Sequence, residues 1–135
     1  MKIKRKPRKY QFSLLEIIIA ISIVSMIVAI AAPSIINQGE VAKTNIAIKQ
    51  MINYKKAIAT YKLETGKLPN SLADLATSQN GNKALLPKVK KDPWKNDFIY
   101  EINSEMYEGY EIISYGADGQ IGGTEFNADI KLSEL

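Results

Sequence analysis

Residues 12–32 read FSLLEIIIAISIVSMIVAIAA, and Glu16 is the only charged residue among these 21. A helix rises about 1.5 Å per residue, so this stretch is long enough to cross a hydrocarbon core of about 30 Å. Its twelve strongly apolar side chains favour insertion by roughly −4 to −7 kcal/mol, which exceeds the cost of about +3 kcal/mol for one carboxylate. The stretch therefore predicts a membrane-spanning helix.

The basic residues are concentrated before this stretch. Six of the 18 lie in the first 11 positions, where there is no acid, whereas residues 12–135 carry 12 basic residues against 14 acids, a net charge of −2. Because basic flanks stay in the cytoplasm, the N-terminus is expected there and the rest of the chain across the membrane. The slightly acidic body does not indicate nucleic acid as a partner.

A cleavable secretory signal peptide is the alternative interpretation of the same region. Ala29-Ile30-Ala31 resembles a cleavage site that follows a basic leader. The apolar run is nevertheless longer than the usual h-region of about 7 to 15 residues, and Glu16 lies inside it. A permanent membrane helix is the favoured reading.

Glu16 is the most informative residue of the span, because an ionised carboxylate in lipid is costly and usually has a partner. No Lys or Arg lies within residues 12–32. If the leader were removed after Gln11, Phe12 would gain a free α-amine, which could neutralise Glu16 between two packed helices. The simpler reading is a Glu16 that is protonated or reaches the cytoplasmic interface, about 6 Å away.

The helical character continues beyond the span, through residues 34–65. Apolar residues recur there at spacings of 4, 3, 4 and 3, which is one helical stripe: Ala47, Met51, Tyr54, Ile58 and Tyr61. Gly66 is the expected C′ stop after Thr65. Pro33 and Gly39 are the predicted weak points, and Pro33 is the candidate for a kink.

The remainder predicts a small sheet that packs against this stripe. Ser71, with Asp74 three residues later, resembles a capping box that starts a short helix through Ala76, and residues 77–91 read as a loop. Residues 98–102 and 110–115 are rich in aromatic and β-branched residues, so they predict a hairpin. Trp94 is interpreted as a core anchor whose N–H is bonded locally.

A glycine-rich stretch, residues 114–130, is the one candidate metal site. Side-chain oxygens come from Asp118, Glu125, Asn127 and Asp129, and four glycines within eight residues let the backbone curl. Ca²⁺ prefers 6 to 8 oxygen ligands of this kind, although the spacing does not match an EF-hand. From these residues alone, an ordinary glycine-rich turn with solvated acids is as good a reading as a metal loop.

The chain has no Cys and no His. This composition excludes disulfides and thiolate metal sites and removes the usual proton shuttle at neutral pH. We find no nucleophile with a base and no phosphate-binding loop, so the chain is not expected to be an enzyme.

The N-terminus resembles that of type IV pilin-like proteins. The resemblance rests on the Lys-rich leader, Phe12-Ser13-Leu14-Leu15-Glu16, the Ile and Val run, and Ala31-Ala32-Pro33. It implies cleavage between Gln11 and Phe12 by a prepilin peptidase, methylation of the Phe12 amine, and docking of subunits through Glu16. Gln11 stands where the family normally has Gly.

Further along, the chain resembles the major pseudopilins of type II secretion. The matching stretches are Thr65-Gly66-Lys67-Leu68-Pro69, Asp92-Pro93-Trp94-Lys95-Asn96, residues 110–115, Gly116-Ala117-Asp118-Gly119 and Asn127-Ala128-Asp129-Ile130. The resemblance implies an α+β, type IV pilin-like fold. A long N-terminal helix, with a membrane-spanning half and an amphipathic half, would pack on a small antiparallel sheet that carries a calcium-binding C-terminal loop.

The same resemblance implies the ligands of that calcium. Asp118 and Asp129 are the main candidates, with carbonyls of Ser114, Tyr115 and Ile121. Ala128 occupies a place where some members have Asp, so Asn127 or Glu125 would contribute instead.

The expected organisation is a cleaved leader at residues 1–11, a membrane and filament-core helix at residues 12–33, and a periplasmic domain at residues 34–135. The chain would form a homopolymer, the periplasmic pseudopilus that drives export of folded proteins across the outer membrane. Its expected partners are minor pseudopilins, an inner-membrane assembly platform and the prepilin peptidase, with a single-pass anchor in the bacterial inner membrane. The alternatives are a type IV pilin or competence pseudopilin of surface fibres, or a secreted calcium-binding module.

Overall fold

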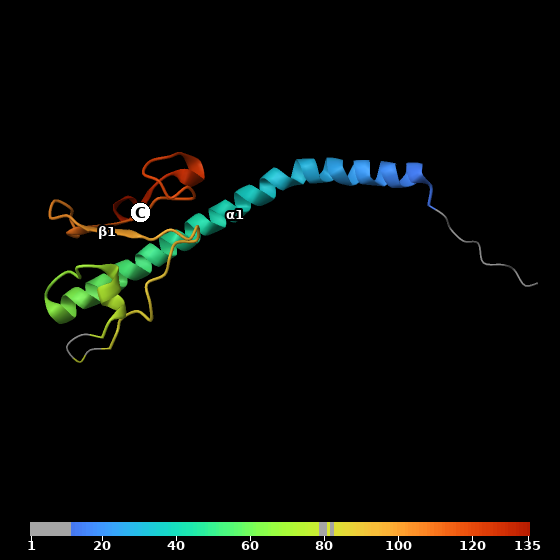
Figure 1. Ribbon diagram of the computed structural model, residues 1–135. Coiled ribbons are helices and arrows are strands. Elements are labelled where there is room, and N and C mark those ends of the chain that lie inside the picture. Colours follow the sequence, from blue (N-terminus) through green and yellow to red (C-terminus); the bar gives the residue numbers. More distant parts are fainter. Residues whose placement is uncertain (1–11, 79–80, 82) are drawn as a thin grey trace, which may run out of the picture. The chain divides into compact units, whose positions relative to one another are not determined.

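A computed structural model describes residues 12–78, 81 and 83–135, without the side chains of residues 33–36. The chain forms two compact units, one that ends at Gln38 and one that comprises Gly39–Leu135. One helix, α1, spans Leu14–Thr65 and contributes to both (Figure 1). The predicted continuity of the membrane segment with the amphipathic segment is thereby confirmed.

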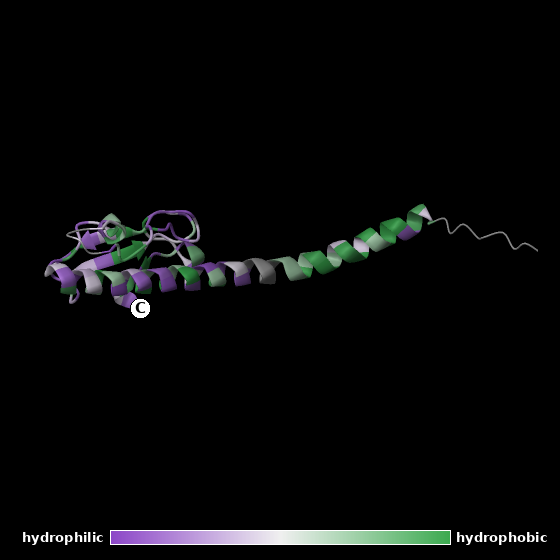
Figure 2. Cartoon of the chain, turned by 90° about the horizontal axis from the view of Figure 1, so that it is seen from below, coloured by the Kyte–Doolittle hydropathy of each residue, from purple (hydrophilic) through white to green (hydrophobic). Residues whose placement is uncertain are grey.

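In the first unit, α1 presents apolar side chains on every side. From Phe12 to Ala31 each described side chain is exposed, as Ile30 is at 76%, and Figure 2 shows this part of the helix as mainly hydrophobic. Ser22 and Ser25 donate their hydroxyls to the carbonyls of Ile18 and Ile21, both at 2.8 Å. These two polar groups are satisfied within the helix, as a membrane or an apolar bundle requires.

In the second unit, α1 buries the predicted stripe. Ala47, Met51, Tyr54 and Ile58 are at most 4% exposed. The helix ends as expected, since Gly66 has a φ of +75° and donates its N–H to the Lys62 carbonyl at 2.9 Å.

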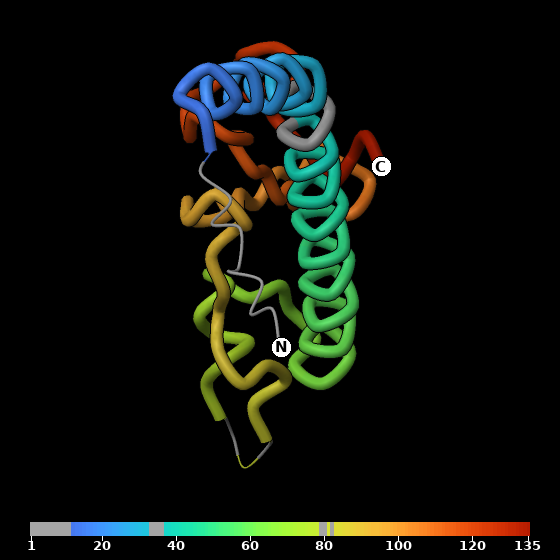
Figure 3. The backbone as a smooth tube through the Cα atoms, turned by 90° about the vertical axis from the view of Figure 1, so that its right-hand side faces the viewer, coloured from blue at the N-terminus to red at the C-terminus, as the bar shows by residue number. Residues whose placement is uncertain are grey.

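A long connection returns along the helix, as Figure 3 shows in yellow. It begins with a short 3₁₀ helix, η1 (Leu72–Ala76), whose start is held by the Asp74 carboxylate; this accepts the N–H groups of Asn70 and Ser71. Further on, the Tyr54 hydroxyl bridges to the backbone of Lys90, with its carbonyl and its N–H both at 2.9 Å. The loop is thus fixed to α1.

The sheet has three antiparallel strands in the order β1-β2-β3. β1 (Ile99–Ile102) and β2 (Tyr110–Ser114) form the predicted hairpin, with Tyr100 opposite Ile112. β3 (Ile130–Lys131) was not predicted, and it pairs Ile130 with Ser114. Two further 3₁₀ turns, η2 (Glu125–Asn127) and η3 (Leu132–Glu134), flank β3.

The core lies between α1 and the inner face of the sheet. Met51 and Ile112 are completely buried, and each contributes about 1.5–3 kcal/mol. The Tyr54 and Phe98 rings meet edge to face, with centroids 5.5 Å apart. The remaining core residues are Ala57, Ile58, Leu72, Leu75, Tyr110 and Leu132.

Candidate functional site

The apolar part of α1 carries the first candidate site, at its N-terminus. Phe12 is 75% exposed, and Glu16 is exposed in the first helical turn. Within the described residues Glu16 forms no ion pair. Gln11 lies outside the described residues, so the cleavage junction stays a prediction.

The predicted kink at Pro33 also stays a prediction. Pro33 lies within the bounds of α1 but belongs to residues 33–36, whose side chains the structure does not describe.

The glycine-rich stretch forms the second candidate site, a closed loop between β2 and β3. Ala117 donates its N–H to the Phe126 carbonyl at 2.8 Å, and Gly122 donates to both Asp129 carboxylate oxygens at 3.0 Å. Gly123 has a φ of +91°, and a Cβ at this position would lie 2.4 Å from the Asn127 carbonyl oxygen. The loop therefore needs glycine here for both conformation and space.

The predicted calcium ligands differ in their exposure and in the hydrogen bonds that they already form. Asp118 is exposed, and its Oδ1 accepts the Gln120 N–H at 3.0 Å, while Asp129 accepts from Gly122 near the other end. Ser114 donates its buried hydroxyl to Asp92 at 2.8 Å, which leaves only its carbonyl as a candidate. The other candidates lie along the loop with varied exposure: Tyr115, Ile121, Glu125 and Asn127.

The donor set suits a hard cation in chemical type, because it consists of carboxylate, amide and carbonyl oxygens. In the part of the chain that the structure describes, no three Asp, Glu, His or Cys side chains gather as a metal cluster. A calcium ion here would therefore depend mainly on two carboxylates, Asp118 and Asp129, together with backbone carbonyls and the side chain of Asn127 or Glu125.

The turn of residues 92–96, which the sequence reading did not select as functional, supports this loop. Asp92 is 4% exposed, and its Oδ1 accepts the N–H groups of Trp94 and Asn96, at 3.0 and 2.8 Å. Its Oδ2 accepts the Ser114 hydroxyl at the end of β2. An aspartate followed by Pro is a known turn signal, and it was the available clue.

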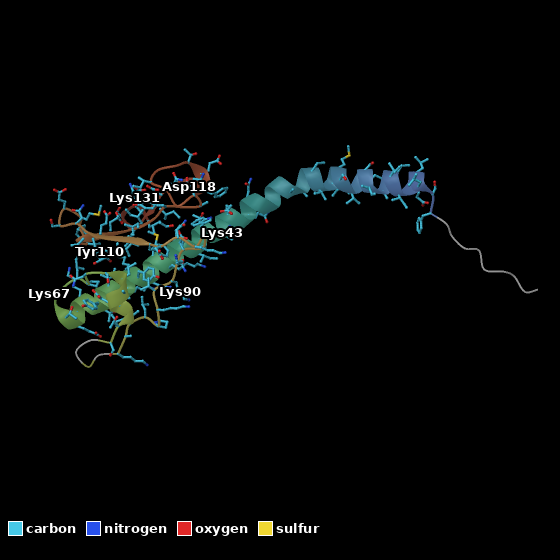
Figure 4. The ribbon with its side chains drawn as sticks, in the orientation of Figure 1. Lys43, Lys67, Lys90, Tyr110, Asp118 and Lys131 are labelled. Atoms are coloured by element: carbon cyan, nitrogen blue, oxygen red, sulfur yellow. The ribbon has the colours of Figure 1, made fainter. Side chains whose placement is uncertain are left out.

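Asn96 joins this turn to the glycine loop. Its Nδ2 donates to the Gly116 carbonyl at 3.2 Å. A Cβ on Gly119 would lie 2.9 Å from the Asn96 Oδ1, so the two segments are closely packed. Figure 4 labels Asp118, the residue that precedes Gly119 in the sequence.

Trp94 corrects two expectations: it is half-buried and does not belong to the core cluster, and its N–H is not bonded locally. The indole Nε1–H donates to Glu40 Oε2 at 2.7 Å, 54 residues earlier on α1. Lys43 donates to the other oxygen of the same carboxylate at 2.8 Å. The hydrogen bond from Lys43, and after it the one from Trp94, hold the pKa of Glu40 below its usual value of 4.5. The turn thus connects the glycine loop to α1.

Comparison with known proteins places this arrangement among secretion components. The family model described as type II secretion system (T2SS), protein G, matches residues 34–133. The chain is 32% identical to type II secretion system core protein G of Xanthomonas campestris pv. campestris, over 88% of this chain and 86% of that protein. It is 28% identical to the Escherichia coli K12 protein of the same name, over 82% and 83% of the two chains.

The fold is also similar to a solved structure. The crystal structure of the major pseudopilin from the type 2 secretion system of enterohaemorrhagic Escherichia coli superposes with a TM-score of 0.58. The match covers 74% of this chain and 94% of that chain, at 21% sequence identity. This likeness supports the fold, in particular the long helix with its small antiparallel sheet.

Proposed function

We propose, because this chain belongs to the family of type II secretion system protein G, that its apolar helix first anchors it in the membrane and then forms the core of a periplasmic pseudopilus. The chain is a major pseudopilin, a structural subunit of the protein secretion machinery. Among the described residues, α1 is the one helix long and apolar enough to cross a membrane. The exposed apolar stretch of this helix, up to residue 31, is the observation that carries the proposal.

The same helix can be stable both in the membrane and in the core of a fibre, because the two surroundings are alike. In lipid and in a bundle of like helices, the surroundings of residues 12–32 are equally apolar, so transfer between them gains little hydrophobic free energy. Polar contacts then set the geometry of assembly. In our proposal Glu16 of one subunit pairs with the Phe12 α-amine of a neighbour, once a prepilin peptidase has cut after Gln11 and the amine has been methylated.

The basic leader sets the direction of insertion. Its lysines and arginines stay in the cytoplasm, so a single pass through the inner membrane leaves the domain after residue 33 in the periplasm. Minor pseudopilins and an inner-membrane assembly platform would then draw subunits into the growing homopolymer, which drives export of folded proteins across the outer membrane.

Mass spectrometry of the mature protein, together with one substitution, tests this function. We expect a methylated Phe12 as first residue, and loss of fibres from Glu16→Ala with the chain still in the membrane. Ser22→Ala is the matched control, because it removes another polar group of the span that is already satisfied within its helix. Wild-type fibre yield from Glu16→Ala, or an uncleaved chain in assembled fibres, would contradict the proposal.

Calcium binding by the glycine loop is the second part of the proposal. Asp118 and Asp129 would supply the carboxylates, and the remaining ligands would come from the carbonyls of Ser114, Tyr115 and Ile121 with the side chains of Asn127 or Glu125. The ion would neutralise the loop acids and cross-link the two ends of the loop. The closed loop with oxygen donors at both ends supports this assignment.

A thermal unfolding series tests the calcium site. At 100 times Kd, calcium should stabilise the domain by about 2.7 kcal/mol, and the gain should disappear with a chelator or in Asp129→Asn. Magnesium at the same concentration is the control, because it demands a stricter octahedron and should stabilise less. An unfolding temperature unmoved by calcium would refute the site.

A further inference from the structure

Charge is divided between two parts of the domain. Residues 39–95 contain eleven lysines and four acids, a net +7, whereas residues 96–135 contain one lysine and nine acids, a net −8. In the view of Figure 4, the labelled Lys90 and Asp118 lie on opposite sides of α1. A polymer of one chain can use such a division, because the basic part of each copy can meet the acidic part of the next.

The outward side of α1 is the basic surface. Opposite its buried stripe, one line of residues is exposed, and it combines lysines with apolar side chains. Leu63 is 87% and Ile46 50% exposed. We name this line the outer helix face: Asn45, Ile46, Lys49, Ile52, Asn53, Lys56, Ala59, Thr60, Leu63 and Glu64.

An open hollow of about 460 Å³ borders this face near the end of α1. Ala59 and Leu63 belong to both, and the rest of its lining is Ile58, Lys62, Gly66, Leu68, Glu108 and Tyr110. Its walls are mainly apolar and suit an aromatic side chain. Of its two charged groups, Glu108 is paired with Lys55, so Lys62 can meet a carboxylate that accompanies the ring.

The acidic surface with matching apolar groups is the hairpin tip, residues 101–108. Tyr107 is fully exposed and Ile102 is 56% exposed. Glu101 and Glu105 are exposed beside them. Tyrosine is enriched among the residues that carry binding energy at interfaces, so an exposed tyrosine at the end of a hairpin suits a contact with another molecule.

We propose that the outer helix face of one copy binds the hairpin tip of the next copy in the pseudopilus. Lys56 faces the carboxylates of the tip, while Tyr107 enters the hollow beside Leu63. The contact joins two different surfaces of the same chain, so it is heterologous and extends into an open helical polymer. This inference rests on the proposed function, since it needs an assembled fibre.

A head-to-tail arrangement of two copies fits these surfaces better than a two-fold arrangement, because a two-fold axis through the outer helix face would set Lys56 against Lys56. The pairing chemistry already occurs within one copy: Lys55 of α1 contacts Glu108 at the base of the hairpin tip at 2.7 Å. The neighbouring copy repeats it on the outward side of the helix.

Cysteine cross-linking tests the contact directly, because the natural chain has no Cys. Chains with Ala59→Cys and chains with Tyr107→Cys, assembled together in cells and then mildly oxidised, should give disulfide-linked dimers; one cysteine per chain excludes a bond within a single copy. The control pair is Lys67→Cys with Glu125→Cys on separate chains, both exposed positions outside the proposed contact, and it should give no dimer above background. Fibres that form normally without dimers from the first pair would overturn the contact.

Charge reversal gives an independent readout. Lys56→Glu and Glu105→Lys should each lower fibre yield by about threefold, as expected for loss and repulsion at an exposed ion pair, and the double variant should recover most of it. Lys67→Glu with Glu125→Lys is the control. A double variant no better than either single one would overturn the contact. Absence of fibres from the wild-type chain would instead refute the proposed function.

Discussion

Replacement of Asp92 by Ala should destabilise the domain more than any other single change in the 92–96 turn. The carboxylate accepts three hydrogen bonds at 2.8–3.0 Å, from two backbone N–H groups and from the hydroxyl of Ser114. Asp92 is 4% exposed and Ser114 is fully buried. An unsatisfied buried donor costs about 1–3 kcal/mol, and the turn N–H groups lie nearer water, so we expect a total of about 3–4 kcal/mol.

Two milder substitutions separate the contributions. Asp92→Asn keeps an oxygen for the backbone donors and loses the charge, so it should cost about 1–2 kcal/mol. Ser114→Ala removes only the hydroxyl and should cost about the same. Asp92→Ala and Ser114→Ala remove the same hydrogen bond. The double variant should therefore be hardly less stable than Asp92→Ala alone.

Urea unfolding at neutral pH measures these costs. Trp94 is the only tryptophan and lies two residues from Asp92, so its fluorescence reports on the turn itself, while circular dichroism reports on α1. Two outcomes would refute the reasoning: a cost of less than about 1 kcal/mol for Asp92→Ala, or a Ser114→Ala effect that is undiminished when Asp92 is already Ala.

Three further predictions concern the pH dependence and the loop. Burial, followed by the charge of Glu108, raises the pKa of Tyr110 to about 12 from 10.0, so the folded state holds this proton more tightly than the unfolded chain. The contribution of Tyr110 to the free energy of unfolding should therefore be fully present below pH 10 and fall by up to about 2 kcal/mol as the pH rises towards 12. Tyr110→Phe should reduce that fall in urea unfolding measured at alkaline pH. A pH profile that is the same in this variant as in the wild type would count against the prediction. The pKa of Glu40 is lowered from 4.5, so its contribution should be present above that pH and be lost as pH falls further; melting temperatures of Glu40→Gln should show a weaker acid dependence than wild type. Gly123→Ala should cost about 2–4 kcal/mol, and Gly122→Ala, with a similar φ of +92° but open space around its Cβ, about 1–2 kcal/mol; equal unfolding free energies for the two would refute the steric argument.

Periodicity explains why the helix and the hairpin could be predicted. The stripe from Ala47 to Tyr61 repeats at helical spacing, and the two main strands are rich in β-branched and aromatic residues. These signals are local, and the fold uses them directly. β3 has only two residues, Ile130 and Lys131, so no alternation exists from which it could be predicted.

Contacts between distant residues account for what the sequence did not reveal. Trp94 bonds to Glu40 across 54 positions, and no spacing rule connects them. Glu111 occupies a strand position that alternation assigns to the outer face, yet it is 4% exposed because η3 covers it and Ser133 donates its N–H to Oε1. Among the described residues its Oε2 has no hydrogen-bond partner. The glycine-rich loop differs again, since its glycines and its side-chain oxygens were visible in the sequence, but the hydrogen bond from the Ser114 hydroxyl to Asp92 was not.

Glu16 finds no oppositely charged group within the described part of its own chain, and in the proposed assembly this would give a row of subunits a polarity. If each carboxylate is satisfied by the amine of a neighbour, one terminus of the row carries an unmatched acid and the other an unmatched amine. The two termini are chemically different, and addition of a subunit at either one regenerates the same unmatched group. The polarity of the row would therefore follow from the subunit itself, and the machinery at the membrane would have only to recognise one of its two ends.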